Sequence, residues 1–375
     1  MKLKIKNISA TAGFMLLGIH TLANAAAIDD RVTVHGYGDT GFIRAVENNY
    51  TQKPGGSTWD YNYLSVNFTA QIDEKTKIIA QIRQGSEILG DMGAYVNYNV
   101  TDSLTARAGQ MKAPVGIFNE IRDIKFLQLS ALTPLMYQDA VGILPDSFKG
   151  AEAIYHLDMG SHRLTFDVYG GEPKGGNKYI QIQPVAAPSY YVLVENMYGG
   201  RLTYKTPLGL KFSLSMFQND LLSNTGLPTV TPPATAPNAT TSTRRLSSAS
   251  IDYRNYNFDI KMEYATATDF PGTANENTGK SYYGQIGYTI ADKFTPYVRY
   301  DYLLYNNNQV DNPSAYQQAK VFGITYRINN NVSMRMENHW NHGYAIPANT
   351  QGIAFDSAAA KLDWNLFAMG VNFIF

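Results

Sequence analysis

The chain ends on FAMGVNFIF (367–375), in which large apolar side chains alternate with smaller ones. Successive side chains of an extended strand point to opposite faces, so every second residue shares a face. One face of this segment would carry Phe367, Met369, Val371, Phe373 and Phe375. The last residues of a protein in water are ordinarily polar and poorly ordered. The segment therefore predicts a terminal strand with one face in an apolar environment.

The same period of two recurs along the chain. It is clear in LSVNFTAQI (64–72), LKFSLSMFQ (210–218) and FDIKMEY (258–264). This pattern predicts strands with one apolar and one polar face, and no helical period recurs to a comparable extent. The side chains expected on the apolar, outward face include Leu64, Val66, Phe68, Phe212, Leu214, Ile260, Met262, Phe322, Ile324, Val371 and Phe373.

Two kinds of connection alternate between these segments. Seven short polar breaks occur near 73–76, 101–103, 158–162, 206–209, 254–257, 291–293 and 329–331. Eight longer segments, rich in Asn, Gly, Pro and Ser, occur near 47–59, 84–91, 112–148, 171–189, 219–244, 267–279, 305–319 and 343–360. These fifteen connections predict sixteen antiparallel strands, with both chain ends on the side of the short turns.

An even number of antiparallel strands, with short turns on one side and long loops on the other, is typical of bacterial outer-membrane barrels. Lipid cannot satisfy an open strand edge, so such a sheet must close. The C-terminal segment would then pair with the first strand, expected at 32–46. The expected fold class is all-β: a transmembrane antiparallel barrel of about sixteen strands within 26–375. A soluble sandwich also shows alternation, but it does not require connections of two lengths on opposite sides.

The first 25 residues predict a secretory signal peptide. Three lysines within the first six residues form a basic start, AGFMLLGI (12–19) forms a short apolar core, and ANA (23–25) is a cleavage site of small residues. Without this segment, 28 basic and 31 acidic residues leave a net charge of −3, which gives no indication of a nucleic-acid partner. Cysteine is absent, which excludes disulfides and cysteine-based zinc sites.

Catalytic motifs are missing or misplaced in this sequence. No G-x-S-x-G occurs. The segment ANENTGKS (274–281) lacks the first glycine of a phosphate-binding loop and leads into a predicted strand. His339 and His342 are three residues apart on a strand and face opposite sides, which prevents a shared metal. We therefore expect no enzyme activity, no metal and no cofactor, with an outer-membrane hydrolase as the less favoured alternative.

Two segments resemble known outer-membrane proteins. The final VNFIF resembles the C-terminal signature that the barrel assembly machinery reads in that family. With its sixteen strands and signal peptide, the chain resembles the trimeric porins of Gram-negative bacteria. RAGQMKAPVGIFNEIRDIKF (107–126) resembles a segment of porins related to the phosphate-selective group. The resemblance implies a homotrimer in the outer membrane, in contact with lipid and lipopolysaccharide, that allows passive diffusion of small hydrophilic solutes or ions.

The third long loop, 112–148, is unusually apolar for an external loop. Exposed apolar surface needs cover, which the inside of the barrel wall would provide. In porins the third loop folds inward and narrows the lumen, so by resemblance this loop forms the pore constriction. Its charged residues, which we expect to face the water path, are Lys112, Glu120, Arg122, Asp123, Lys125 and Asp139. The alternative is a subunit contact or a surface flap that leaves the pore open.

Strand parity places charged side chains on the pore wall. The basic ones are Arg83, Arg107, Arg163, Arg201, Lys261, Arg299 and Arg335. The acidic ones are Glu152, Asp167, Asp259, Glu263, Asp301 and Glu337. Charged rings set ion preference in a narrow pore, but here the two signs nearly cancel. We therefore expect at most a weak anion preference. A surface adhesin or structural barrel is the alternative, because the loop 223–245 is rich in Pro, Thr and Ala.

Overall fold

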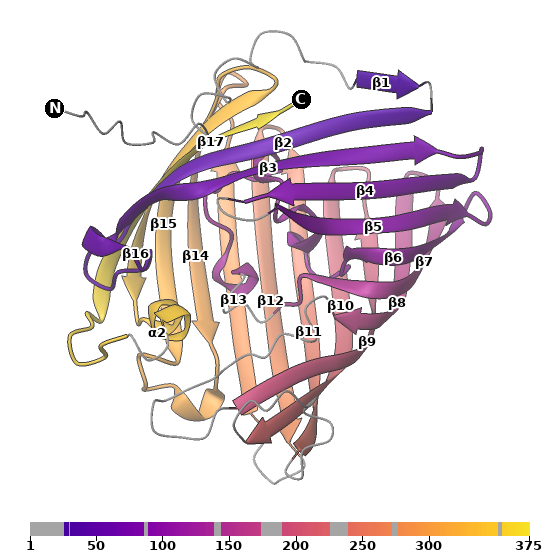
Figure 1. Ribbon diagram of the computed structural model, residues 1–375. Helices are drawn as coiled ribbons and strands as arrows, with labels where there is room; N and C mark the ends of the chain where they lie inside the picture. The colour runs from indigo at the N-terminus through magenta and orange to yellow at the C-terminus, as the bar shows by residue number, and fades with distance from the viewer. Residues whose placement is uncertain are drawn as a thin grey trace, which may run out of the picture.

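The computed structural model describes residues 26–29, 31–85, 89–138, 144–173, 190–225, 239–271, 277–351 and 355–375. Within these residues, sixteen long strands and one short strand form a single sheet (Figure 1). The predicted signal peptide, 1–25, lies outside the described residues. The strands are β1 Ala26–Asp29, β2 Val32–Arg44, β3 Ser57–Gln71, β4 Thr76–Gln84, β5 Leu89–Asn99, β6 Leu104–Lys112, β7 Ser147–Met159, β8 His162–Pro173, β9 Tyr190–Lys205, β10 Leu210–Thr225, β11 Ala239–Asn255, β12 Phe258–Pro271, β13 Asn277–Tyr288, β14 Phe294–Leu304, β15 Tyr316–Arg327, β16 Val332–His342 and β17 Asp363–Ile374.

The sheet closes between its first and last long strands. β17 pairs antiparallel with β2, in a register that sets Phe373 opposite Gly38. Gly36 and Phe375 exchange backbone hydrogen bonds of 2.8 and 2.9 Å just beyond this ladder. The predicted pairing of the C-terminal segment with the first strand is confirmed, and with it the closed antiparallel barrel of sixteen strands, β2 to β17. The short β1, which the sequence does not predict, adds to the start of β2 beyond the end of β17.

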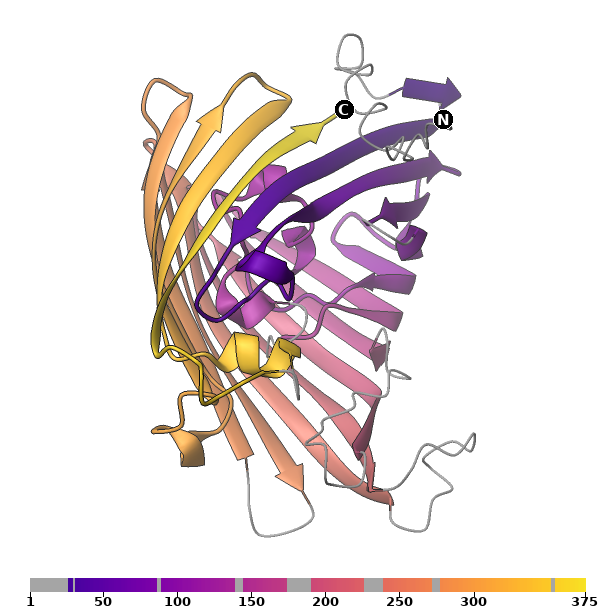
Figure 2. The same cartoon turned by 60° about the vertical axis from the view of Figure 1, so that its left-hand side comes forward.

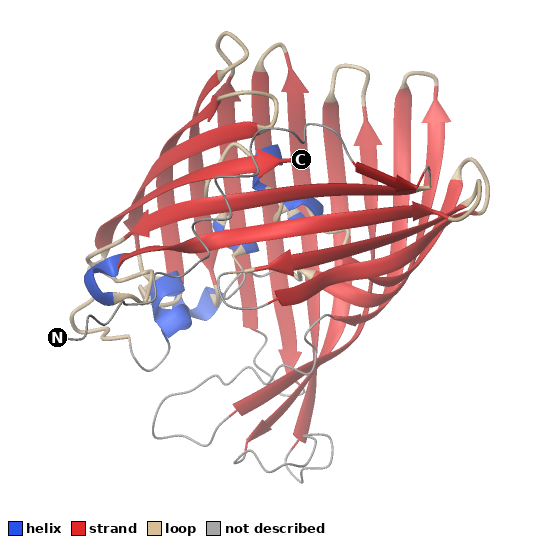
Figure 3. Ribbon diagram, turned by 45° about the horizontal axis from the view of Figure 1, so that its top comes forward, coloured by secondary structure: helices blue, strands red, loops and turns tan. Residues whose placement is uncertain are grey.

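Seven turns at one end of the barrel occur where the sequence predicts them. They are 72–75, 100–103, 160–161, 206–209, 256–257, 289–293 and 328–331. In the two-residue turn, Tyr256 and Asn257 both have positive φ, 47° and 66°. This conformation matches the twist of the flanking strands. The longer connections leave the opposite end of the barrel (Figure 3).

The lengths of three connections differ from the prediction. Connections 85–88 and 272–276 are as short as the turns at the other end. The sequence predicts the fifth long loop at 219–244, whereas β10 continues to Thr225 and β11 begins at Ala239. Cross-strand pairing continues here through polar residues, with Ser223 opposite Thr240. Backbone groups pair whatever the polarity of the side chain, and Thr favours strands, so polarity alone ends these strands too early.

The alternation of faces is confirmed by the exposure of individual side chains. On the predicted outward face, Leu214 is 60% exposed and Met262 is 51% exposed. On the opposite face of the same two strands, Ser215 is 4% exposed and Lys261 is fully buried. The outward face is the one that would meet lipid, and the inward face carries the charged residues of the wall.

Short helices occur in the long connections. They include η1 Pro54–Gly56, η6 Asn307–Gln309 and α2 Ala345–Gln351, as well as η2 Asn119–Ile121, η3 Lys125–Leu127 and η4 Leu135–Tyr137 between β6 and β7. The last three lie within the ring of strands in two views (Figures 1 and 2). Within the described ranges, no helix is long and apolar enough to cross a membrane.

The interior of the barrel contains an apolar core as well as polar side chains. Phe118 and Met136 of the β6–β7 connection are buried against Phe148, Met197 and Leu246 of the wall. Burying such side chains contributes about 1.5–3 kcal/mol each. On this side of the barrel, the inward face that the alternation predicts to be polar is therefore apolar where the connection covers it. Strand alternation gives the direction of a side chain, but not whether a loop covers it.

Candidate pore site

The β6–β7 connection, 113–146, is bound to the wall at three anchors. The first anchor is Glu263 of β12, which is 3% exposed. Its carboxylate accepts hydrogen bonds of 2.8 and 2.7 Å from the Tyr137 hydroxyl. That hydroxyl in turn accepts from the backbone N–H of Ile117 at 3.0 Å and of Phe118 at 3.2 Å. One buried carboxylate therefore joins both arms of the connection to the wall.

The second anchor is a row of charged side chains on β14 and β16. The carboxylate of Glu337 accepts from the backbone N–H of Ala131 at 3.1 Å and of Leu132 at 2.8 Å. Arg299 donates to the carbonyl of Leu132 at 3.0 Å. Arg335 donates through Nε and Nη2 to the carbonyl of Gln128, at 2.9 and 2.6 Å. Backbone groups that would otherwise be buried without partners are thus satisfied by ionised side chains.

The third anchor lies beneath the seam where the barrel closes. The short helix η3 contacts both β2 and β17. Its Lys125 is only 3% exposed, close to the buried Asp39 of β2. Burial lowers the pKa of Lys125 to about 8, although the nearby carboxylates of Asp39 and Asp123 oppose the shift. The helix η3 therefore packs against the strands that close the barrel, with Lys125 buried near Asp39.

On the side of β4 to β9, the wall and the connection share ion pairs that remain in contact with water. Arg83 pairs with Asp123 at 2.9 Å, and its guanidinium lies 4.3 Å from the centre of the Tyr63 ring. Arg201 pairs with Glu120 at 2.6 Å. The side chains of Arg83 and Glu120 are 28% and 42% exposed, respectively. In this part of the lumen, charged groups of the wall pair directly with charged groups of the connection, and the pairs remain partly exposed.

Two further residues, Lys112 and Asp146, complete this charged cluster, and the buried Arg122 borders it. Lys112, at the end of β6, forms ion pairs with both Asp123 and Asp146. Arg122 approaches Asp146 at 3.5 Å. Burial raises the pKa of Asp146, but the two cations outweigh that effect and leave the pKa below its ordinary value. Asp146 is therefore a fixed negative charge at neutral pH, with its side chain 39% exposed.

The structure separates the sequence-predicted residues into two groups. Lys112, Glu120 and Asp123 lie in the solvated cluster, together with Arg83, Arg107 and Arg201 of the wall. Arg122 and Lys125 are buried, at 5% and 3% exposure, so their charges do not face the water path as expected. The physical reason is that the Arg122 guanidinium turns toward Asp146, and that Lys125 lies beneath the closing strands near Asp39.

The remaining residues predicted on the pore wall or in the loop lie outside the charged cluster. Arg299, Asp301, Arg335 and Glu337 are at most 3% exposed and lie under the connection that they help to anchor. Arg163 is 53% exposed at the short-turn end, where it pairs with Asp158 at 2.6 Å. Asp139 lies outside the described residues.

Two residues of the site are missed by sequence reasoning. Tyr137 and Asp146 both lie in the third loop, but Tyr carries no charge and Asp146 stands near the predicted strand. The aromatic content of the loop is the signal that could have found Tyr137. Among the described residues, no group of three or more His, Asp or Glu side chains is placed to hold a metal ion.

Comparisons with known proteins bear on the fold. No protein-family model matches the chain, and no curated protein sequence matches it. The chain is similar to the solved structure of outer-membrane expressed OmpT of Vibrio cholerae, at 14% identity and a TM-score of 0.59 over 92% of this chain and 99% of that one. It is also similar to an anion-selective porin from Comamonas acidovorans, at 12% identity and a TM-score of 0.58 over 92% and 99%.

A third similar structure is the outer membrane channel DcaP of Acinetobacter baumannii, at 12% identity and a TM-score of 0.55 over 92% of this chain and 97% of that one. At sequence identities this low, the similarity shows the fold alone. The similarity spans almost the whole of each chain, so it covers the complete closed barrel. The protein has the fold of an integral outer-membrane β-barrel of the sixteen-stranded porin type.

Proposed function

We propose that this protein is an outer-membrane channel for passive diffusion of small hydrophilic solutes or ions. The observation that carries the proposal is the partly exposed charged cluster, in which Glu120 and Asp123 of the third loop pair with Arg201 and Arg83 of the wall. A closed barrel excludes lipid from its interior, so a solute meets these charges on its way through. The loop thereby sets the width and the charge of the passage.

The exposure of the charges supports a weak anion preference. On the wall, Arg83 and Arg107 are each 28% exposed, whereas the carboxylates of Glu152 and Asp167 are only 2% exposed. Guanidinium groups also keep their charge at any relevant pH. The exposed carboxylates Glu120 and Asp146 of the loop oppose this positive wall. Charges of both signs therefore line the passage, and the preference for anions stays small.

The proposal extends to assembly and processing. The mature chain would be 26–375, after removal of the signal peptide, and would be inserted by the barrel assembly machinery next to lipid and lipopolysaccharide. A homotrimer is supported by a similar structure described as the trimer form of OmpT. The similar porin described as anion-selective supports the direction of the ion preference. Transport down a gradient requires no catalytic group and no cofactor. The resemblance of 107–126 to phosphate-selective porins stays a prediction.

A second candidate is a structural barrel or surface adhesin without an open passage. The observation that favours it is the apolar core between the third loop and strands β7 to β14, which fills part of the lumen. The loop 223–245 would then act at the surface; only its two ends lie within the described residues.

Planar bilayer recording tests the proposal. The purified protein should produce discrete open-channel steps in KCl, with a reversal potential in a KCl gradient that indicates a slight excess of chloride current. A protein that inserts and folds, as judged by its resistance to unfolding in detergent, yet gives no steps would contradict the channel and support the structural barrel. A hydrolase would be recognised by turnover of lipid or peptide substrates in the same preparation.

A further inference from the structure

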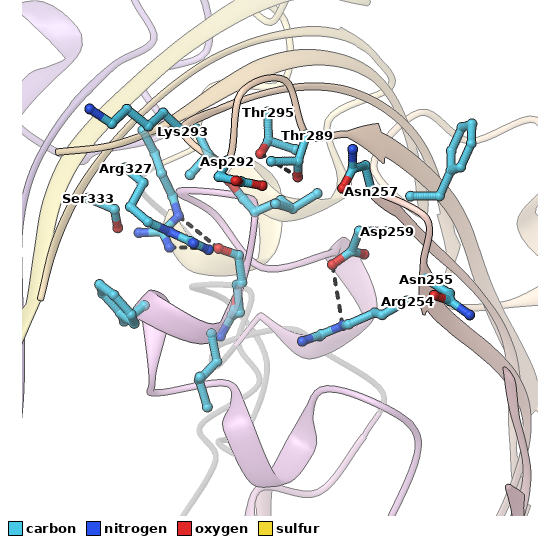
Figure 4. A pocket seen from close by; sticks show the side chains of 17 residues that line it. Arg254, Asn255, Asn257, Asp259, Thr289, Asp292, Lys293, Thr295, Arg327 and Ser333 are labelled. Carbon is cyan, nitrogen blue, oxygen red and sulfur yellow. Dashed lines mark hydrogen bonds and ion pairs between the residues drawn. The ribbon is translucent and has the colours of Figure 1, made fainter. Parts of the chain in front are cut away.

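A cavity of about 420 Å³ lies below the third loop, near the turns of β11 to β16. Residues 126–129 of the loop cover it, and strands β11, β12, β14, β15 and β16 contribute side chains. Its lining carries four basic residues, Arg254, Lys293, Arg327 and Arg335, against two acidic ones, Asp259 and Asp292. Figure 4 shows Arg327 and Ser333 on one side of the cavity, and Arg254 with Asp259 on the other.

The basic residues differ in how far their charge is already neutralised. Arg254 pairs with Asp259 at 3.3 Å and approaches Asp252 at 3.6 Å. Arg327 forms no ion pair with any carboxylate of the described residues. Arg335 donates two hydrogen bonds to the carbonyl of Gln128, and its Nη1 has no hydrogen-bond partner among the described residues. Arg327 and Arg335, on the side of β15 and β16, thus form no ion pair within the described residues, although the carboxylates of Asp39 and Glu337 lie near Arg335.

Strand register brings these two guanidinium groups together. Arg327 of β15 lies opposite Ser333 of β16, and Arg335 is the next residue on the same face of β16. Such diagonal neighbours have Cα atoms about 7–8 Å apart, within reach of long side chains, and like charges at this range repel each other. Arg335 is 1% exposed whereas Arg327 is exposed, so water screens this repulsion only on the side of Arg327. An anion between the two side chains would remove it and would satisfy free guanidinium donors.

We propose that this cavity binds an oxyanion group, such as a carboxylate, sulfate or phosphate, of a small solute between Arg327 and Arg335. Guanidinium groups present planar, forked donors that suit oxyanions better than spherical chloride. The proposal rests on the proposed channel function only in that the passage would deliver the anion; the binding itself requires no conduction. The site would hold a permeating anion after it passes the loop, at the short-turn end of the barrel.

Isothermal titration of the purified full-length protein in detergent micelles tests this inference. The probes are sodium phosphate, sodium sulfate and sodium acetate, each in a low-chloride buffer, and they identify which oxyanion is preferred. We expect one bound anion per chain for at least one probe. Arg327→Gln should weaken that binding at least about tenfold, because it removes a charge-assisted hydrogen-bond donor. Arg327→Lys keeps the positive charge but loses the forked guanidinium. Its affinity for the anion should therefore fall between those of the native protein and Arg327→Gln.

Lys77→Gln supplies the matched control. Lys77 is an exposed inward-facing residue near the turn at 72–75, and it does not line the cavity. The inference is overturned if none of the three anions binds, or if Lys77→Gln weakens binding as much as Arg327→Gln does. Binding that is retained in a protein without bilayer conductance would support the site while contradicting the channel. Bilayer conductance by a protein that binds none of the three anions would support the channel and contradict the site.

Discussion

Replacing Glu337 with Gln should release the third loop from β16. In the native protein, both carboxylate oxygens accept a backbone hydrogen bond, one from Ala131 and one from Leu132. The side-chain amide of the Glu337→Gln variant keeps one acceptor oxygen but turns an NH₂ group toward the other N–H. A hydrogen bond to a charged acceptor is worth about 1.5–3 kcal/mol, and a buried donor left unsatisfied costs about 1–3 kcal/mol. The two effects together lower the local stability by roughly 3 kcal/mol.

Hydrogen–deuterium exchange measures this loss at the affected amides. A change of about 1.4 kcal/mol corresponds to a factor of ten, so exchange at Ala131 and Leu132 should become roughly 100-fold faster in Glu337→Gln. Glu263→Gln is the control, because it weakens the anchor at Tyr137 and Ile117 instead. Exchange at Ala131 and Leu132 that changes by less than about threefold in Glu337→Gln would refute the assignment of Glu337 as an anchor of the loop.

Three further outcomes are expected. Arg83→Gln combined with Arg107→Gln should move the reversal potential in a KCl gradient toward cation selectivity, and an unchanged potential would remove these residues from the water path. Met262→Arg should destabilise the folded barrel in lipid vesicles by about 2–4 kcal/mol, measured by chemical unfolding; no loss would show that Met262 does not face lipid. Because burial lowers the pKa of Lys125 to about 8 from its ordinary 10.5, the unfolded chain binds more protons between these values, and stability should rise as pH increases from about 8 to 10.5. The rise should disappear in Lys125→Met, and an identical pH profile for both proteins would contradict this origin.

The barrel could be predicted from the sequence because each of its determinants is local. The period of two fixes which face of a strand carries Phe212 or Met262, and the short breaks fix the turns. FAMGVNFIF identifies the last strand, and closure then follows from the absence of any partner for an open edge in lipid. The register of Phe373 opposite Gly38 depends on the arrangement of all sixteen strands, and no short segment encodes it.

The sequence pattern could not predict which charged residues remain exposed to water and which are buried beneath the loop. Parity correctly directs both Arg83 and Arg335 to the interior, yet Arg83 remains 28% exposed beside Asp123 of the loop, whereas Arg335 is buried beneath the loop. The difference arises from a contact between Arg335 and Gln128, which are 207 residues apart. Lys125 shows the same limit, because its helix η3 packs against both β2 and β17, which lie near opposite ends of the chain. Contacts over such separations depend on the path of the loop. The loop sequence has no periodic pattern from which that path could be predicted.

The central claim is that solutes pass between the third loop and the wall formed by β4 to β9. The native chain has no cysteine, so Arg107→Cys places a single thiol on this wall, and Ser248→Cys places one beneath the loop, where the native side chain is 5% exposed. Single channels in planar bilayers are recorded while a negatively charged, thiol-reactive reagent is added. If solutes take this path, the current should fall abruptly in Arg107→Cys and should not change in Ser248→Cys. An unchanged current in Arg107→Cys after complete modification, verified by mass spectrometry, would contradict the central claim.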